Sequence, residues 1–256
     1  MPAGFRSRRQ LVAEVWITFW LSLGTSGLYA ALSLVKSLTA SHAPLSHQLA
    51  VLESPVAPER SLLDLSYQLA GVLTALAPVG LVAYLLGRSG ESLRTLGLDR
   101  RRPVSDWGWG AALAAGVGGI GLVLYLAAFH AGVALNVVPT TLPSAWWRLP
   151  VLVLQAFQNG LLEEVVVCGY LLHRLRQLGW RDDRALVVSS LVRGSYHLYQ
   201  GLGGFVGNAA MGLLFGRIFQ RRGRVAPLVI AHTLIDAFAF VGYVYLAGKV
   251  AWLPKP

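Results

Sequence analysis

The 256-residue chain is 55% hydrophobic and only 13% charged, with a net charge of +10 and a mean hydropathy of +0.55. Soluble globular proteins contain about 25% charged residues, and here the apolar residues form runs separated by short arginine-rich stretches. This pattern excludes a soluble domain and a disordered chain. It predicts an all-α fold, a polytopic helical bundle in a membrane. The single cysteine, Cys168, excludes an intramolecular disulfide and any CxxC metal site.

Seven segments are long and apolar enough to be predicted as membrane spans. They cover about residues 11–35, 66–87, 108–134, 149–172, 185–200, 202–219 and 225–247. The fifth is short and contains Arg193, His197 and Gln200. We expect it to be shielded by protein, because lipid cannot satisfy polar groups.

The basic residues alternate between the two ends of these spans. Sixteen fall in the N-terminal tail and in the segments after spans two, four and six, and five fall on the opposite side. The positive-inside rule then predicts a cytoplasmic N-terminus and an external C-terminus. Nucleic-acid binding is set aside, because its footprint would be one basic patch with interleaved aromatic residues.

The first predicted span follows a basic stretch, as a signal peptide would, and Ser41–Ala43 offers small residues for cleavage. The apolar segment is much longer than a signal sequence, so we expect the helix to be retained. Nineteen of the 22 basic residues are Arg, which together with abundant Ala, Leu and Gly indicates a GC-rich bacterial genome. We therefore predict one integral-membrane domain, residues 1–256, in a bacterial plasma (inner) membrane.

Ionisable residues inside membrane spans are costly and need a partner or a function. Those predicted inside spans are Glu14, Glu163, Glu164, Arg193, His197, His232 and Asp236. Glu14 lies near the cytoplasmic end of its span, where it can reach the surface or pair with another helix. The other six cluster in spans four, five and seven.

Spacing and depth bring this cluster together. Residues four apart share a helix face, which pairs Asn159 with Glu163 and His232 with Asp236; the same rule would pair Arg193 with His197. At a rise of ~1.5 Å per residue from the nearest cytoplasmic arginine, Glu163, His197, His232 and Asp236 lie ~16, ~20, ~12 and ~18 Å deep. The four side chains can therefore meet in one layer of the membrane.

Three kinds of chemistry use this residue set. A buried carboxylate beside imidazoles is a general-base arrangement. Glu163, His197 and His232 could instead bind zinc, because one Glu and two His recur as a catalytic zinc set. An ion or proton relay in a transporter uses the same residue types. A fourth interpretation involves no chemistry: the buried polar side chains pair with one another only to fix helix packing.

Three motifs resemble the CPBP intramembrane proteases, the family of CAAX proteases and bacteriocin-processing (Abi) proteins. Glu163-Glu164-Val-Val-Val-Cys168-Gly169 resembles the family's Glu-Glu-x-x-x-Arg motif followed by Gly. Arg193-Gly-Ser-Tyr-His197 is similar to Phe-x-x-x-His, and His232-Thr-Leu-Ile-Asp236 to His followed four residues on by Asn or Asp. The resemblance covers about residues 149–247.

The resemblance implies a catalytic core at 149–247 and an endopeptidase whose site lies within the bilayer. It implies that Glu163 activates water, that His197 positions this water, and that His232 and Asp236 stabilise the oxyanion or complete the site. An oxyanion role requires a hydrogen-bond donor. Asp236 must then be protonated, or else orient His232 or bind a metal.

The sequence departs from the family motifs at two positions. Cys168 replaces the usual Arg, and Arg193 replaces the usual Phe. We interpret this as a guanidinium that has moved to the next span and still neutralises Glu164, because an unpaired charge there would be costly. Cys168 is then a small packing residue.

A membrane peptidase is the favoured function, acting on a peptide or membrane-protein substrate. The chain lacks a His-Glu-x-x-His sequence, so glutamate-dependent and zinc-dependent hydrolysis both stay open, and no cofactor is required. The alternatives are a catalytically degenerate membrane scaffold and a small transporter. A transporter would be expected to show repeats in both halves, whereas the polar residues lie mainly in the C-terminal part.

Overall fold

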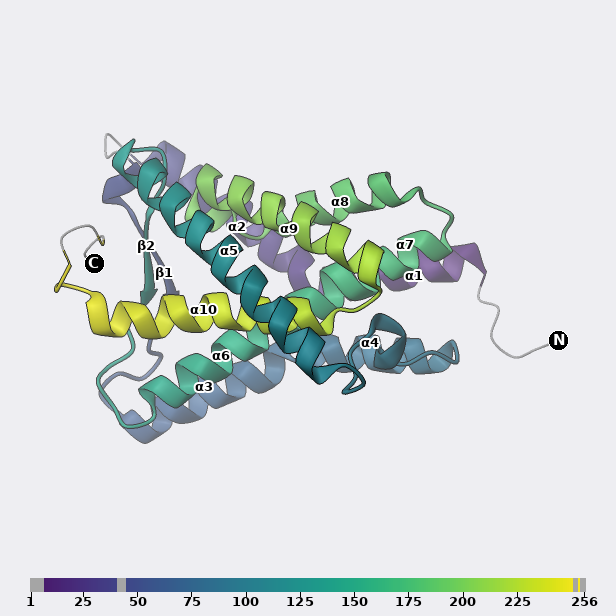
Figure 1. The fold of residues 1–256 in the computed structure, drawn as a ribbon. Coiled ribbons are helices and arrows are strands. Elements are labelled where there is room, and N and C mark those ends of the chain that lie inside the picture. Colours follow the sequence, from purple (N-terminus) through teal and green to yellow (C-terminus); the bar gives the residue numbers. More distant parts are fainter. Residues whose placement is uncertain (1–6, 41–44, 251–252, 254–256) are drawn as a thin grey trace.

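The computed structural model describes residues 7–40, 45–250 and 253. Ser41–Ala43, the candidate cleavage region, lies outside the described residues, as do Arg6 and Lys255 of the basic-residue pattern. The chain is 76% helical, and its helices run roughly parallel to one long axis (Figure 1). The predicted all-α membrane bundle is therefore confirmed.

In chain order the helices are α1 (Arg8–Phe19), the π-helix η1 (Trp20–Gly24), α2 (Thr25–Thr39), the 3₁₀ turn η2 (Leu45–His47), α3 (Ser61–Ala75), α4 (Ala77–Arg88), the 3₁₀ turn η3 (Leu93–Leu96), α5 (Pro103–His130), α6 (Arg148–Glu163), the π-helix η4 (Glu164–Leu171), α7 (Leu172–Gln177), α8 (Asp182–Ser195), the 3₁₀ turn η5 (Leu198–Gln200), α9 (Leu202–Arg222) and α10 (Ala226–Leu246). The longer connections between helices, from α2 to α3 and from α5 to α6, each contain a strand.

Six of the described helical segments are long and apolar enough to cross a membrane. They are Arg8–Thr39, Ser61–Arg88, Pro103–His130, Arg148–Gln177, Leu202–Arg222 and Ala226–Leu246. The predicted fifth span corresponds to α8, whose 14 residues extend about 21 Å, less than the ~30 Å hydrocarbon core. The chain is a multi-pass membrane protein, while its total of seven spans stays a prediction.

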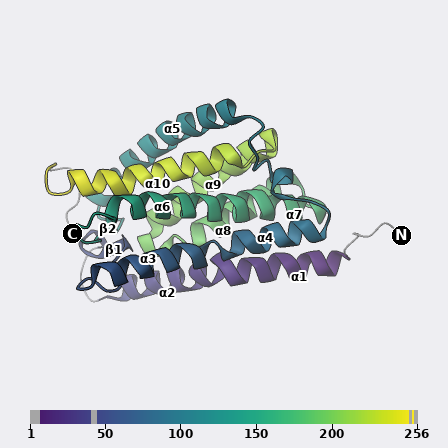
Figure 2. The ribbon, with the colours of Figure 1, turned by 90° about the horizontal axis from the view of Figure 1, so that it is seen from below.

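Two strands, which the sequence analysis did not predict, lie across one end of the bundle. β1 (Leu49–Glu53) pairs in parallel with β2 (Asn136–Thr140), with Glu53 opposite Thr140. In Figure 1 they run at a steep angle to the helices, beside the C-terminal part of α10. The view from below, Figure 2, places β1 and β2 at the same end of the bundle as the C-terminus and far from the N-terminus. We call this end the strand side.

Polar contacts tie the strand side to α3 and α6. The indole Nε1 of Trp147 donates to Ser61 Oγ at 3.0 Å, and Gln155 Nε2 donates to Gln68 Oε1 at 2.9 Å. Asp64 Oδ1 accepts from two backbone N–H groups of the segment that follows β1. The first two bonds join α3 to α6, and the Asp64 bonds fix the segment that follows β1.

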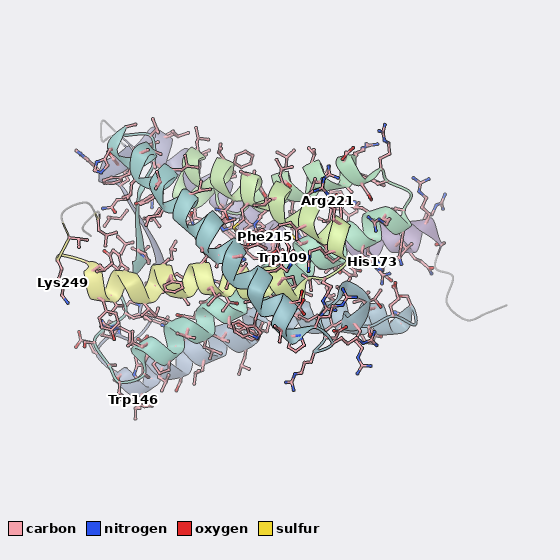
Figure 3. All side chains as sticks on the ribbon, viewed as in Figure 1. Trp109, Trp146, His173, Phe215, Arg221 and Lys249 are labelled. Carbon is pink, nitrogen blue, oxygen red and sulfur yellow. The ribbon has the colours of Figure 1, made fainter. Side chains whose placement is uncertain are left out.

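The opposite end carries most of the basic side chains. Figure 3 places Arg221 and His173 toward the end where the N-terminus lies, and Lys249 and Trp146 at the strand side. At the N-terminal end, Arg174 is fully buried and donates to Glu91 at 2.6 Å, while Arg224 donates to Asp106 at 2.6 Å. Burial opposes the ionisation of Glu91, but His173 and Arg174 outweigh it and lower the pKa of that carboxyl. The Asp106 and Asp99 carboxylates likewise raise the pKa of Arg224.

Candidate active site

The two adjacent glutamates stand where α6 changes into the π-helix η4. Glu163 is the last residue of α6 and Glu164 the first of η4, and both are buried. π-Helical segments are rare and occur frequently at functional sites. The wider turn lets two neighbouring carboxylates approach the same group on α8, although they point in different directions around the helix.

That group is the guanidinium of Arg193, near the end of α8. Its Nη2 lies 2.7 Å from Glu164 Oε1 and 3.4 Å from Glu163 Oε2. Arg193 and Glu164 are both fully buried, so each side chain balances a charge that would otherwise be buried without a partner. The ion pair that the two motif departures suggested is thus present in the structure.

Packing around Arg193 makes room for its long side chain. A Cβ on Gly212 would lie 3.1 Å from Arg193 Cδ and 3.1 Å from the backbone of Ser190. The guanidinium carbon also lies 5.6 Å from the centroid of the Phe215 ring, within cation–π range. α9 therefore supports Arg193 with a small residue and an aromatic face.

His232, on α10, bridges the enclosed ion pair to the more open part of the site. Its Nδ1 lies 2.8 Å from Glu164 Oε1 and 3.1 Å from Arg193 Nη2. Because Glu164 can only accept, we assign the Nδ1 proton to the bond with Glu164, and the Arg193 contact is then not a hydrogen bond. Nε2 of the same ring is 3.7 Å from Asp236 Oδ1.

Glu163 is held through one oxygen and faces a histidine with the other. The Tyr196 hydroxyl donates to Oε2 at 2.8 Å, whereas Oε1 lies 3.9 Å from His197 Nε2. His197 Nδ1 is 3.1 Å from the carbonyl oxygen of Arg193, a bond in which the ring N–H must donate. The lone pair of His197 Nε2 therefore faces Glu163 in the neutral tautomer.

Asp236 lies on the strand side of this cluster. Its Oδ2 accepts from Asn159 Nδ2 at 3.2 Å, and its side chain is 21% exposed. The side chains of Glu163 and His197 are 11% exposed, and those of Glu164 and Arg193 are fully buried. Access to the cluster therefore increases from the Glu164–Arg193 pair toward Asp236.

The six ionisable residues predicted to cluster meet here together with Asn159, with one correction to their placement. The expectation that His197 shares a helix face with Arg193 is wrong, because α8 ends at Ser195 and His197 lies in the turn before η5. Its ring returns to the cluster by capping the Arg193 carbonyl. Tyr196 was missed; a tyrosine between two motif residues was the available signal.

The zinc alternative is not supported by the side-chain arrangement. No group of three or more His, Cys, Asp or Glu residues is disposed to hold a metal ion anywhere in residues 7–40, 45–250 and 253. The Arg193 guanidinium lies within 3.4 Å of both Glu163 and His232, where it would repel a cation. Glu163, His197 and His232 do not form a ligand set in this geometry.

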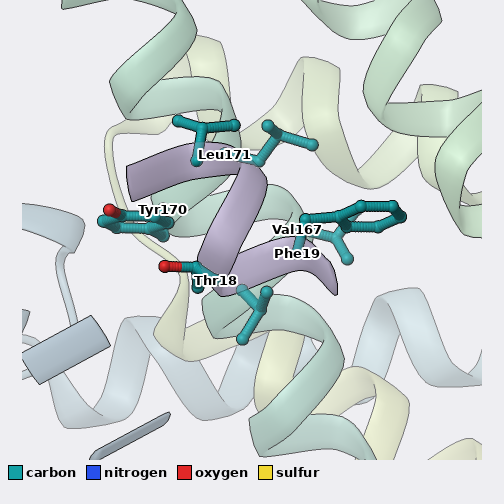
Figure 4. A pocket seen from close by; sticks show the side chains of 7 residues that line it. Thr18, Phe19, Val167, Tyr170 and Leu171 are labelled. Atoms are coloured by element: carbon teal, nitrogen blue, oxygen red, sulfur yellow. The ribbon is translucent and has the colours of Figure 1, made fainter. Parts of the chain in front are cut away.

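Cys168 and Glu14, which the sequence analysis also considered, lie outside the cluster and contribute to packing between helices. Cys168 is 1% exposed and lies in the apolar core, in agreement with a packing residue. The Tyr170 hydroxyl lies 3.5 Å from Glu14 Oε2, which links α1 to η4 and fits the helix-pairing interpretation of Glu14. The small pocket beside this contact, between α1 and η4, is lined mainly by apolar side chains (Figure 4). Its volume of about 10 Å³ leaves room for one water molecule at most.

The fold and the site thus define a multi-pass membrane protein with buried glutamate, histidine and arginine side chains from three helices. Residues 145–238 match the family model of the type II CAAX prenyl endopeptidase Rce1-like proteins. This part of the chain is an Rce1-like domain, so the resemblance to the CPBP proteases is confirmed. Neither the curated proteins nor the solved structures include a match to this chain.

Proposed function

We propose that the chain is an intramembrane endopeptidase in which Glu163 activates a water molecule. The Rce1-like domain indicates a CAAX-type intramembrane peptidase, and its substrate is then a peptide or a membrane protein. The observation that carries the proposal is the 3.9 Å separation between Glu163 Oε1 and His197 Nε2. Polar atoms at this separation can share a bridging water.

In this mechanism Glu163 is the general base. Oε1 takes a proton from the water, whose oxygen attacks the scissile carbonyl, while His197 Nε2 accepts the water's second hydrogen bond. Tyr196 and Arg193 hold Oε2, so that Oε1 alone is presented to the water. After attack, the protonated Glu163 can pass its proton to the leaving nitrogen.

The other residues of the site bind the substrate carbonyl oxygen or balance the charge of Arg193. When its ring is doubly protonated, His232 donates through Nε2 as well as through Nδ1. Nε2 lies beside Asp236 on the strand side of Glu163, where a substrate carbonyl oxygen needs hydrogen-bond donors. Glu164 neutralises Arg193 and orients His232 through Nδ1. Asn159 fixes the Asp236 carboxyl from α6.

The proposed topology keeps the cytoplasmic N-terminus and a single integral domain, with the catalytic core at 149–247, in a bacterial plasma membrane. Peptide hydrolysis is favoured over the scaffold and transporter alternatives because Glu163 has one oxygen fixed and the other turned to a histidine. A glutamate that only fixes helix packing would not need its two oxygens in different surroundings.

The test is cleavage of a farnesylated peptide with a C-terminal CAAX sequence by the full chain in lipid vesicles. Wild type is expected to release the C-terminal fragment, and Glu163→Gln to lose at least about 10²-fold in rate, within the range for a general base. Glu59→Gln, at an exposed carboxylate in the loop after β1, is the matched control. Equal rates for wild type and Glu163→Gln would contradict the proposal.

The same peptide without the prenyl group tests the finer specificity. Cleavage of both peptides with the same dependence on Glu163 would support a peptidase that does not read the lipid. Cleavage of the farnesylated form alone would support CAAX processing.

A further inference from the structure

A chain of carboxamide side chains leads from the strand side into the bundle between α3 and α6. These two helices lie side by side in both Figure 1 and Figure 2. Gln68 Nε2, on α3, donates to the backbone oxygen of Ser54 at 3.2 Å, and Ser54 is exposed in the loop after β1. Gln68 Oε1 accepts from Gln155 Nε2, on α6, at 2.9 Å. Both carboxamides are buried, although they lie in helices long and apolar enough to cross a membrane.

The chain continues along one face of α6 to the active site. Gln155, Asn159 and Glu163 follow one another at intervals of four residues, so their side chains lie on the same side of the helix. Asn159 Nδ2 donates to Asp236 Oδ2 at 3.2 Å, and Asn159 Oδ1 accepts from Gln158 Nε2 at 3.2 Å. This polar face extends ~12 Å along α6 from Gln155 to Glu163.

Two buried oxygens on this chain have no hydrogen-bond partner among the described residues. One is Gln155 Oε1, and the other is Oδ2 of Asp64, whose Oδ1 lies 3.4 Å from Gln68 Nε2. Asp64 is fully buried, and Gln155 is 5% exposed. Buried polar atoms that lack a protein partner are commonly satisfied by enclosed water molecules, each of which needs several polar neighbours. The carboxamide chain offers such neighbours on both helices.

We propose that Gln68, Gln155 and Asn159 line an enclosed water path, through which the water consumed in hydrolysis reaches Glu163 from the strand side. The inference rests on the proposed function, in which the substrate carbonyl oxygen lies beside Asp236. The Asp236 side chain is 21% exposed and forms the open part of the site, so a bound substrate covers it. The attacking water then needs another route, and a polar helix face provides one in an apolar bundle.

Helix pairing alone explains less of the arrangement. Carboxamides commonly join membrane helices, which would account for the bond between Gln68 and Gln155. It would not account for the unpartnered oxygens of Gln155 and Asp64, because a buried acceptor costs free energy when it is left dry. The water path satisfies both oxygens.

Two substitutions at Gln155 separate the explanations, with cleavage of the CAAX peptide by the full chain in vesicles as the measurement. Gln155→Leu fills the space of the carboxamide with apolar atoms. We expect kcat to fall about tenfold, the effect of one hydrogen bond lost to a buried water, and KM to stay unchanged because no substrate contact is altered. Gln155→Ser breaks the same bond to Gln68 but leaves room for water and a hydroxyl that binds it, so kcat should stay within about twofold of wild type.

A structural role predicts the opposite order. If the carboxamide only holds α3 against α6, Gln155→Ser must lose at least as much activity as Gln155→Leu, because it breaks the same bond and also leaves a cavity. That result would overturn the inference, as would an unchanged kcat in Gln155→Leu. Gln10→Leu, the same substitution at an exposed residue outside the path, is the control and should match wild type.

A second readout does not depend on activity. In NMR spectra of the full chain in lipid bicelles, with ¹⁵N-labelled glutamine, the side-chain amide protons of Gln155 should exchange magnetisation with water. A dry contact between α3 and α6 would give no such exchange and would overturn the inference. If Glu163→Gln cleaved the peptide normally, the proposed function would fail, and the NMR result would still decide whether the path holds water.

Discussion

At the scale of single residues, the site is organised by one buried cation. Arg193 lies within 3.4 Å of Glu163 and Glu164 and next to His232, so three motif residues depend on its charge. The sequence contains this cation in the second motif and a cysteine in the first, the reverse of the charge placement in the resembling family. The ion pair explains how two unusual residues coexist in one membrane core.

A double-mutant cycle measures this dependence. Arg193→Met or Glu164→Gln alone should each destabilise the protein by about 3–5 kcal/mol, because each leaves an uncompensated buried group. The double variant should lose much less than the sum. The free energy of unfolding in detergent is the measurement, and additive losses would contradict a compensating pair.

The solvent-exposed pair Arg176 and Asp182 provides the control for this cycle. Their side chains are 56% and 50% exposed, although they lie 2.9 Å apart. Exposed ion pairs contribute about 0–1 kcal/mol, so the same cycle there should give almost no coupling. A coupling as large as at Arg193 would indicate a change in the unfolded state.

At the scale of helices, the site depends on how closely α6 approaches α10. A Cβ on Gly160 would lie 2.7 Å from Thr233 Oγ1 and 2.9 Å from its backbone nitrogen. Small residues allow such contact between membrane helices. Gly160 adjoins Asn159 and precedes Glu163 by one turn, so the close contact sets how near these side chains lie to Asp236 and His232.

Gly160→Ala should therefore reduce peptide cleavage more than a glycine-to-alanine substitution elsewhere in a helix does. The added methyl must separate α6 from α10, which lengthens the Asn159–Asp236 contact, and a displacement of about 1 Å at a catalytic site can cost about 10² in rate. Gly116→Ala, on α5, meets no atom within 4 Å and is the matched control. Equal rates for both variants would argue against the packing explanation.

Sequence patterns predicted the long helices, but they did not predict the end of α8, the π-helix or the two strands. Charge and hydropathy placed the long helices well, because apolar runs and arginine loops are local signals. The end of α8 at Ser195 and the π-helix that starts at Glu164 lie beside contacts between residues far apart in the sequence, such as the hydrogen bond from Tyr196 to Glu163, which no short sequence pattern encodes. The strands were missed since β1 and β2 pair across more than eighty residues.

At the scale of the whole molecule, the site can be recognised in the sequence because so few ionisable residues lie within the predicted membrane spans. Spacing alone grouped Glu163, His197, His232 and Asp236, and the structure brings them together. Tyr196 could not be found this way, because a phenol is unremarkable in a membrane protein. Its contribution becomes visible only from its hydrogen bond to Glu163, 33 residues earlier in the chain.

The central claim is hydrolysis of peptide bonds that depends on Glu163. The most direct measurement is the mapping of new protein termini in membranes that contain wild type or Glu163→Gln, prepared in ¹⁸O-labelled water. The account predicts new carboxyl termini that carry the label with wild type and with Glu59→Gln, and that are missing with Glu163→Gln. The same set of new termini with Glu163→Gln, or none with wild type, would contradict it.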